Sequence, residues 1–259
     1  MRIAELCHDI PSKLFQQIFL ATMATLAVLI IKITKDKQPL IISDVIDLSE
    51  VKPVGSGTYR DVYPMPEHPT LMLKVLRKNS VLRPGRPIRN FLKNRNKRQV
   101  YNFMYREYRC YLDLKIKQDT IGGSLPIAEM VGLRQTSLGL AMVTERIRGK
   151  DGGNAKSLGQ IKNDGEIANK VLGQINHFIA EAFRWGLVAN DTNPENLMLD
   201  ETLPFARFVL VDGFGDANPI PYATWFPSQA DKKLNRRFVT MAKFLDMTWD
   251  EKARKILRG

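Results

Sequence analysis

Short runs of hydrophobic residues follow one another between residues 38 and 76, and their length and β-branched content predict strands. A Pro-rich turn at 64–69 separates the last run, 71–76, from the strand before it. Two more strand-like runs cover 130–133 and 138–147. The chain up to residue 147 is therefore expected to be rich in β-structure.

Apolar residues at helical spacing predict three helices, at about 91–117, 161–185 and 232–257. A glycine-containing break at 149–153 separates the last two of these helices from the predicted strands, whereas the first lies between strands. Strands followed by helices predict an α+β fold with a cleft between the two parts.

An uncharged stretch of eighteen residues, 14–31, precedes the predicted strands. As a helix it would span roughly 27 Å, at the short end of a membrane span. Two interpretations stay open: a membrane anchor, or a helix that packs on the domain or lies in the membrane interface. If it spans, Lys32, Lys35 and Lys37 favour a cytoplasmic location for the rest of the chain.

The net charge of +12 is unevenly distributed. Residues 77–98 contain nine basic and no acidic side chains, whereas residues 151–220 contain ten acidic and five basic ones. The basic segment is either a solvated insertion or a dock for anionic lipid, phosphorylated glycolipid or nucleic acid. Nucleic acid is less favoured, because residues 77–90 contain no aromatic side chain for base stacking. The two cysteines and three histidines have no metal-ligand spacing.

Two acidic motifs lie 21 residues apart in the mildly acidic region. Asp191 is followed five residues later by Asn196, with Pro-Glu between them and apolar residues after them, which is a spacing typical of a kinase catalytic loop. Asp212 follows the apolar run 208–211 and begins a glycine-flanked turn, as a magnesium-binding aspartate does. The alternatives are an ordinary polar turn and an Asp-Gly strand end.

A glycine-rich turn and a lysine complete the set. Gly55 and Gly57 would let backbone N–H groups approach phosphate, and Val62 lies where an apolar cover for adenine is expected. Lys74 lies within the apolar run 71–76, where an unpaired cation is unfavourable unless an edge strand exposes it.

In order and spacing these motifs resemble the protein-kinase superfamily, and more narrowly the small YrbL-type (PhoP regulatory network) bacterial kinase-like proteins, over roughly residues 49–246. The resemblance implies a kinase-like two-lobed fold with a truncated C-lobe, preceded by the hydrophobic helix. The expected parts are an N-terminal segment at 1–40, a β-rich N-lobe at 41–148 and a reduced helical C-lobe at 149–259.

The resemblance also implies roles for these residues. Lys74 would contact the α- and β-phosphates of ATP, and Glu107, or less favourably Glu129, would hold it by an ion pair. Asp191 would be the catalytic carboxylate. Magnesium would be bound by Asn196 and Asp212, and the backbone from Glu145 to Ile147 would contact adenine.

Several positions depart from the conventional protein-kinase pattern. Arg60 replaces the third glycine of the phosphate loop, Ala189 and Asn190 replace His-Arg, and Gly213 interrupts Asp-Phe-Gly. Asn193 stands in place of a lysine, and no Ala-Pro-Glu element follows. We therefore expect a Mg-ATP phosphotransferase that acts on a lipid, glycolipid or small hydroxyl compound rather than on protein. The alternatives are a nucleotide-binding pseudokinase with a regulatory role and a basic membrane- or nucleic-acid-binding module.

Overall fold

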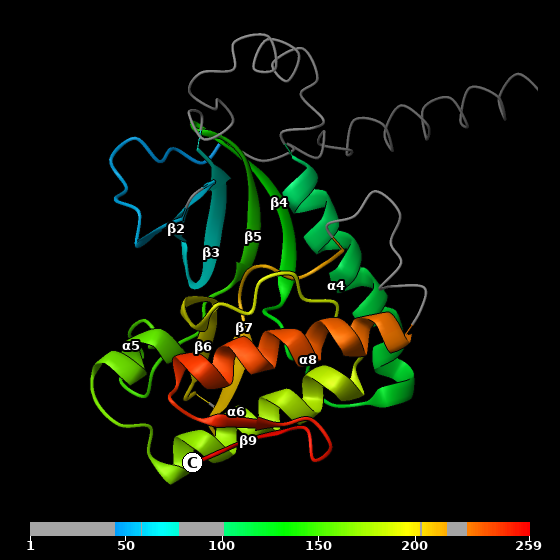
Figure 1. Ribbon diagram of the computed structural model, residues 1–259. Coiled ribbons are helices and arrows are strands. Elements are labelled where there is room, and N and C mark those ends of the chain that lie inside the picture. The colour runs from blue at the N-terminus through cyan, green and yellow to red at the C-terminus, as the bar shows by residue number, and fades with distance from the viewer. Residues whose placement is uncertain (1–44, 58, 78–100, 203, 217–226) are drawn as a thin grey trace, which may run out of the picture. The chain divides into compact units, whose positions relative to one another are not determined.

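The computed structural model describes residues 45–57, 59–77, 101–202, 204–216 and 227–259. Residues Val45–Gly259 form one compact unit of mixed α+β structure (Figure 1). The hydrophobic stretch 14–31 and nearly all of the basic segment 77–98 lie outside the described residues. Within the described part, no helix is both long enough and apolar enough to span a membrane.

Five antiparallel strands form the main sheet, in the order β1-β2-β3-β5-β4. Their bounds are β1 Gly55–Ser56, β2 Arg60–Met65, β3 His68–Leu76, β4 Met130–Thr136 and β5 Gly139–Glu145. These strands lie in the predicted regions, except that β2 and β3 extend into the predicted turn 64–69 and β4 continues three residues beyond the predicted 130–133. Pro64 is tolerated in β2 because it lies at a register shift and beyond the short β1, where the strand lacks a second neighbour.

The two faces of this sheet differ in chemistry because successive side chains of a strand point to opposite sides. Leu73 and Val75 of β3 pack in an apolar cluster with Tyr63 of β2 and Val143 of β5. Lys74 belongs to the opposite face, where Val62 is its partner on β2. Arg60, two residues before Val62, lies on the same face as Lys74, so the sheet presents two cations on one side.

Helix α4 (Asn102–Ile121) covers the described part of the predicted helix 91–117, whose residues 91–100 lie outside the described residues, and it joins the sheet to the helical part. Its buried residues Met104 and Leu114 share one apolar cluster with Met130 and Met142 of the sheet. Tyr111 Oη donates a 2.6 Å hydrogen bond to Glu129, just before β4.

The predicted helix 161–185 is observed as two helices, α5 (Leu158–Asn163) and α6 (Asn169–Arg184). Gly165, with φ of +152°, lies in the link between them. Ser157 caps α5, since its hydroxyl accepts from Gln160 N while the Gln160 side chain accepts from Ser157 N.

The predicted helix 232–257 is wrong in its last part. Helix α8 (Pro227–Phe244) ends early, and the chain continues as a hairpin of β8 (Thr248–Asp250) and β9 (Lys255–Leu257) (Figure 1). Asp246 adopts a positive φ of 57°, which cannot continue a right-handed helix. The apolar cluster that contains α4 also contains Phe178 of α6 and Phe238 of α8, whose rings meet edge to face.

A short hairpin of β6 (Leu197–Asp200) and β7 (Arg207–Leu210) lies between the sheet and helices α6 and α8 (Figure 1). The 3₁₀ turn η2 (Pro194–Asn196) precedes β6, and Asn193 caps it by accepting a 3.1 Å hydrogen bond from Glu195 N. The hairpin brings the chain around Asn196 to the residues that follow β7, because Val211 N donates to Asn196 O at 2.9 Å. The β6–β7 hairpin therefore brings the two acidic motifs together at one of its ends.

Candidate functional site

A cavity of about 830 Å³ lies between the glycine-rich turn, the sheet, α4 and the end of the β6–β7 hairpin. Every residue expected at the site from the sequence lines it. These ten residues are Gly55, Gly57, Val62, Lys74, Glu107, Glu145, Ile147, Asp191, Asn196 and Asp212. Segments far apart in the sequence thus converge on one cavity.

Asp191 and Asp212 are brought together by hydrogen bonds to one residue. The backbone N–H groups of Asn190 and Asp191 both donate to the carbonyl oxygen of Gly213, at 2.8 and 3.0 Å. The Asp191 carboxylate also accepts a 3.1 Å hydrogen bond from Asn193 N, which fixes its own turn. The two acidic turns are therefore joined through backbone groups.

Gly213 is required by this junction. Its φ of +82° lies in the left-handed region, and a Cβ there would lie 2.8 Å from Asp191 Cβ and closer still to the Asp191 carbonyl oxygen. The glycine that departs from the kinase pattern thus has a structural explanation: a side chain would separate the two turns.

The glycine-rich turn is closed by its own backbone. Gly57 N donates to Arg60 O at 2.8 Å, and Val54 N donates to Val62 O at 2.8 Å. A Cβ at Gly55 or Gly57 would make only ordinary contacts, at 3.9 and 3.5 Å. The Gly57 N–H group is therefore occupied, and it binds a ligand only if the turn rearranges.

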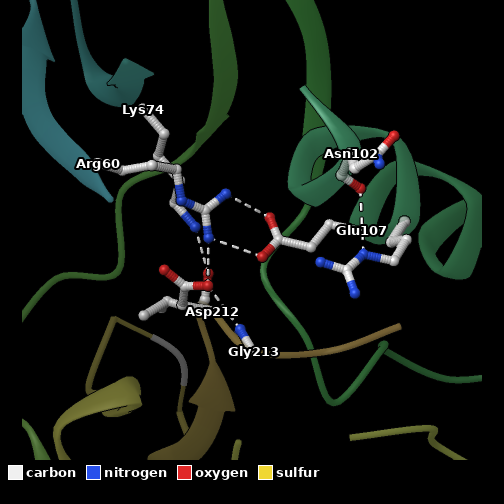
Figure 2. Close-up of polar contacts among 8 residues, drawn as sticks. Arg60, Lys74, Asn102, Glu107, Asp212 and Gly213 are labelled. Atoms are coloured by element: carbon white, nitrogen blue, oxygen red, sulfur yellow. Dashed lines mark hydrogen bonds and ion pairs between the residues drawn. The ribbon is translucent and has the colours of Figure 1, made fainter. Parts of the chain in front are cut away.

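The charged side chains of the cavity form a pairing that the sequence did not predict (Figure 2). The Arg60 guanidinium meets both carboxylate oxygens of Glu107, with Nη1–Oε2 at 2.6 Å and Nη2–Oε1 at 2.7 Å. Its Nη2 also donates to Asp212 Oδ1. Lys74 Nζ donates to the carbonyl oxygen of Val211, and within the described part of the chain no carboxylate lies within 4.0 Å of it.

The expected Lys74–Glu107 ion pair is therefore replaced by an Arg60–Glu107 pair. A guanidinium has a planar fork of donors that matches a carboxylate with two parallel bonds, which a lysine ammonium cannot provide. The alternative partner, Glu129, lies elsewhere, because its carboxylate accepts from Tyr111 and, at 2.9 Å, from Lys115. Glu107 is thus the carboxylate that α4 contributes to the cavity.

The protonation equilibria reflect this arrangement. Burial disfavours the charge of Arg60, but Glu107 and Asp212 outweigh it and raise the pKa of Arg60 above its ordinary value. Burial lowers the pKa of Lys74. Burial alone would raise the pKa of Asp212, yet the cations Lys74 and Arg60 bring that pKa below its usual range. Asp212 is therefore ionised at neutral pH.

The residues expected to contact adenine have structural bonds of their own. Glu145 N donates to Glu129 O at 2.9 Å, and the Glu145 carboxylate accepts from Glu129 N at 2.9 Å. Burial raises the pKa of this carboxyl group. Ile147 accepts a 3.2 Å hydrogen bond from Ala155 N through its carbonyl oxygen. A nucleotide base would have to hydrogen-bond to backbone groups between Glu145 and Ile147 that are not already engaged in these bonds.

Several contacts of the site had no clear signal in the sequence. Glu195 accepts a 2.6 Å hydrogen bond from Ser157 Oγ and lies against Gly159 of α5, where a Cβ would displace it. Lys233 of α8 donates to the side-chain oxygen of Asn190. The sequence marked Glu195 only through the Pro-Glu-Asn motif, and no sequence pattern indicated its contacts with Ser157 and Gly159.

The donor atoms around Asp212 decide which metal the site could hold. No cluster of three His, Cys, Asp or Glu side chains suited to a metal occurs among the described residues. Asp212 and Asn196 both line the cavity and would supply one carboxylate and one amide oxygen, a set that suits Mg²⁺, which is commonly bound by one or two carboxylates together with substrate phosphates.

A comparison with protein-family models identifies the family. The model of the PhoP regulatory network protein YrbL matches residues 46–246, which is most of the chain. The chain therefore belongs to the YrbL family. No curated protein matches the sequence significantly.

Proposed function

We propose that the cavity binds Mg-ATP and that the protein is a phosphotransferase with a kinase-like two-lobed fold and a reduced C-lobe. The observation that carries the proposal is the convergence of all ten residues on one cavity, with the Asp191 and Asp212 turns joined through Gly213. A chance match of short motifs gives no reason for such convergence.

Each part of the cavity has a task in this proposal. Val62 and Ile147 line the cavity and would cover the base, and the buried Lys74 would contact the phosphates. Asp212 and Asn196 would hold magnesium, which when bound neutralises charge on the phosphates. Asp191 would orient the acceptor hydroxyl and take its proton.

The acceptor is proposed to be a lipid, a glycolipid or another small hydroxyl compound. The departures from the protein-kinase pattern support this choice, because Ala189 and Asn190 replace His-Arg before Asp191 and Asn193 stands in place of a lysine. We also propose that residues 14–31 and the basic segment 77–98 hold the protein at the cytoplasmic side of an anionic membrane, where such acceptors occur.

A nucleotide-binding pseudokinase is the second candidate. One observation favours it: Arg60 holds both Glu107 and Asp212, two carboxylates that the kinase pattern assigns to lysine and to metal. Such a protein would bind ATP and release no ADP.

Three variants separate these functions. Asp212→Asn should weaken Mg-ATP binding, because it removes the charge of a metal ligand. Asp191→Asn should leave ATP binding nearly unchanged and slow turnover by about 10²–10⁴-fold, the usual range of a lost general base. Lys74→Met should impair both.

The measurements are ATP binding by calorimetry and ADP release with a panel of hydroxyl acceptors. If Asp191→Asn turns over as fast as the parent, Asp191 is not the catalytic carboxylate. If the parent binds ATP and forms no ADP with any acceptor or water, the protein is a pseudokinase. If the parent binds no nucleotide, the proposed function fails.

A further inference from the structure

Arg60 is held at the inner wall of the cavity by carboxylates from two different elements. Its side chain is 8% exposed, and the Glu107 side chain on α4 is 5% exposed. The Asp212 side chain, 37% exposed, is the open member of the group. Figure 2 shows the guanidinium between the two carboxylates, with Lys74 beside it.

The bonds of Arg60 to its two partners are unequal. Glu107 receives two parallel bonds, one from each terminal nitrogen, and is sealed from solvent beneath the guanidinium. Asp212 receives one bond, from Nη2, and its exposed side faces the cavity. Arg60 can therefore give up Asp212 and still keep its bidentate pair with Glu107.

The Asp212 oxygen that Arg60 contacts accepts a second hydrogen bond as well. Asp212 Oδ1 accepts from Arg60 Nη2 and, at 2.6 Å, from the backbone N–H of Gly213. A divalent cation would bind to the same carboxylate group, and an adjacent guanidinium repels it. Arg60 thus occupies the position of a cation at Asp212.

We propose that Arg60 and a divalent cation compete for the Asp212 carboxylate. Arg60 is then a positioning residue that keeps Asp212 neutralised without metal and sets the metal concentration at which the site is loaded. The inference rests on the proposed function in one respect, because the metal in question is the one that would accompany the nucleotide.

The test begins with Mn²⁺ alone, measured by calorimetry and by its electron paramagnetic resonance spectrum, with no nucleotide present. Arg60→Gln by itself would leave Glu107 buried without a partner and endanger folding. The double variant Arg60→Gln/Glu107→Gln replaces both charged groups by neutral amides and removes the guanidinium from Asp212, which keeps Lys74 near it. It should bind Mn²⁺ about tenfold more tightly than the parent, within the usual range of coupling between ligands.

Two further variants should have the opposite effect on Mn²⁺ affinity and no effect on it, respectively. Glu107→Gln leaves Asp212 as the remaining carboxylate of Arg60, so Mn²⁺ should bind more weakly than to the parent. Lys115→Gln/Glu129→Gln removes another ion pair of α4, one outside the cavity, and should leave Mn²⁺ affinity within about twofold of the parent. Adding Asp212→Asn to the Arg60–Glu107 double variant should abolish the gain.

A second arm follows ATP binding as Mg²⁺ is titrated. The Arg60→Gln/Glu107→Gln variant should reach half-maximal binding at a lower Mg²⁺ concentration than the parent. Equal Mn²⁺ affinity in the parent and this variant, or no Mn²⁺ binding in any variant, overturns the competition, whatever nucleotide binding shows. If no variant binds ATP while the Mn²⁺ affinities differ as stated, the proposed function fails and the competition stands.

Discussion

Replacing Gly213 by alanine should destabilise the fold more than a positive φ alone explains. Gly213 joins the Asp191 and Asp212 turns, and an added Cβ would lie within 3.0 Å of both the Cβ and the carbonyl oxygen of Asp191. The atoms in its way include backbone, so the turn as a whole has to move. The change is therefore expected to break the junction rather than be absorbed by a side-chain rotation.

The magnitude has two parts. Holding alanine at φ of +82° destabilises the fold by about 1–2 kcal/mol. Moving the Asp191 turn removes the two backbone hydrogen bonds to Gly213 O, at about 0.5–1.5 kcal/mol each. The expected loss of unfolding free energy is about 2–5 kcal/mol, the sum of these terms.

Gly152 is the matched control. Its φ of +78° is nearly the same, and a Cβ there would meet no atom within 4 Å. Gly152→Ala should therefore destabilise by the conformational part alone, about 1–2 kcal/mol.

Urea unfolding followed by circular dichroism measures both variants. With a slope of about 2–3 kcal/mol per M, the midpoint should fall by about 1–2 M for Gly213→Ala and by about 0.5 M for the control. If the two variants lose the same free energy, the junction through Gly213 contributes nothing beyond its backbone conformation, and the reasoning is refuted.

Three further predictions concern other parts of the chain. Burial raises the pKa of Cys110 to about 12, so in a Cys7→Ser background at pH 8 its alkylation should follow the rate of unfolding, and rapid labelling of the folded protein would contradict this. Binding of the basic segment 77–98 to acidic vesicles should fall steeply between about 50 and 200 mM salt, whereas salt-independent binding would exclude a charge-based contact. If residues 14–31 span a membrane, the full-length protein should stay in the membrane fraction through a carbonate wash, and release by that wash would exclude a span.

The candidate site was largely predictable from local sequence because its motifs combine special residue types at short spacing. Lys74 stood out as a cation within an apolar run, and the structure places it on the cavity face of β3. Arg60 was noticed only as a missing glycine. Its bond to Glu107 depends on how α4 packs against the sheet, which joins residues 47 positions apart and leaves no local pattern.

The C-terminal hairpin shows how periodicity can mislead. Trp249 and Ile256 are apolar strand residues that continue the helical spacing of Phe238 and Leu245 by coincidence. No proline or glycine before Gly259 marks the end of the helix. The turn is made instead by Asp246 at a positive φ, a conformation that its sequence context does not announce.

The apolar cluster that runs from Met130 and Met142 through α4 to Phe178 and Phe238 has a consequence for motion. A rigid-body hinge between the sheet and the helices would have to break this shared packing, which is unfavourable in a close-packed interior. The glycine-rich turn has less packing around it, since Val54, Ser56 and Gly57 are exposed. Entry to the cavity is therefore expected to depend on a few residues at β1, while β2, held through Arg60, and the rest of the domain move as one body.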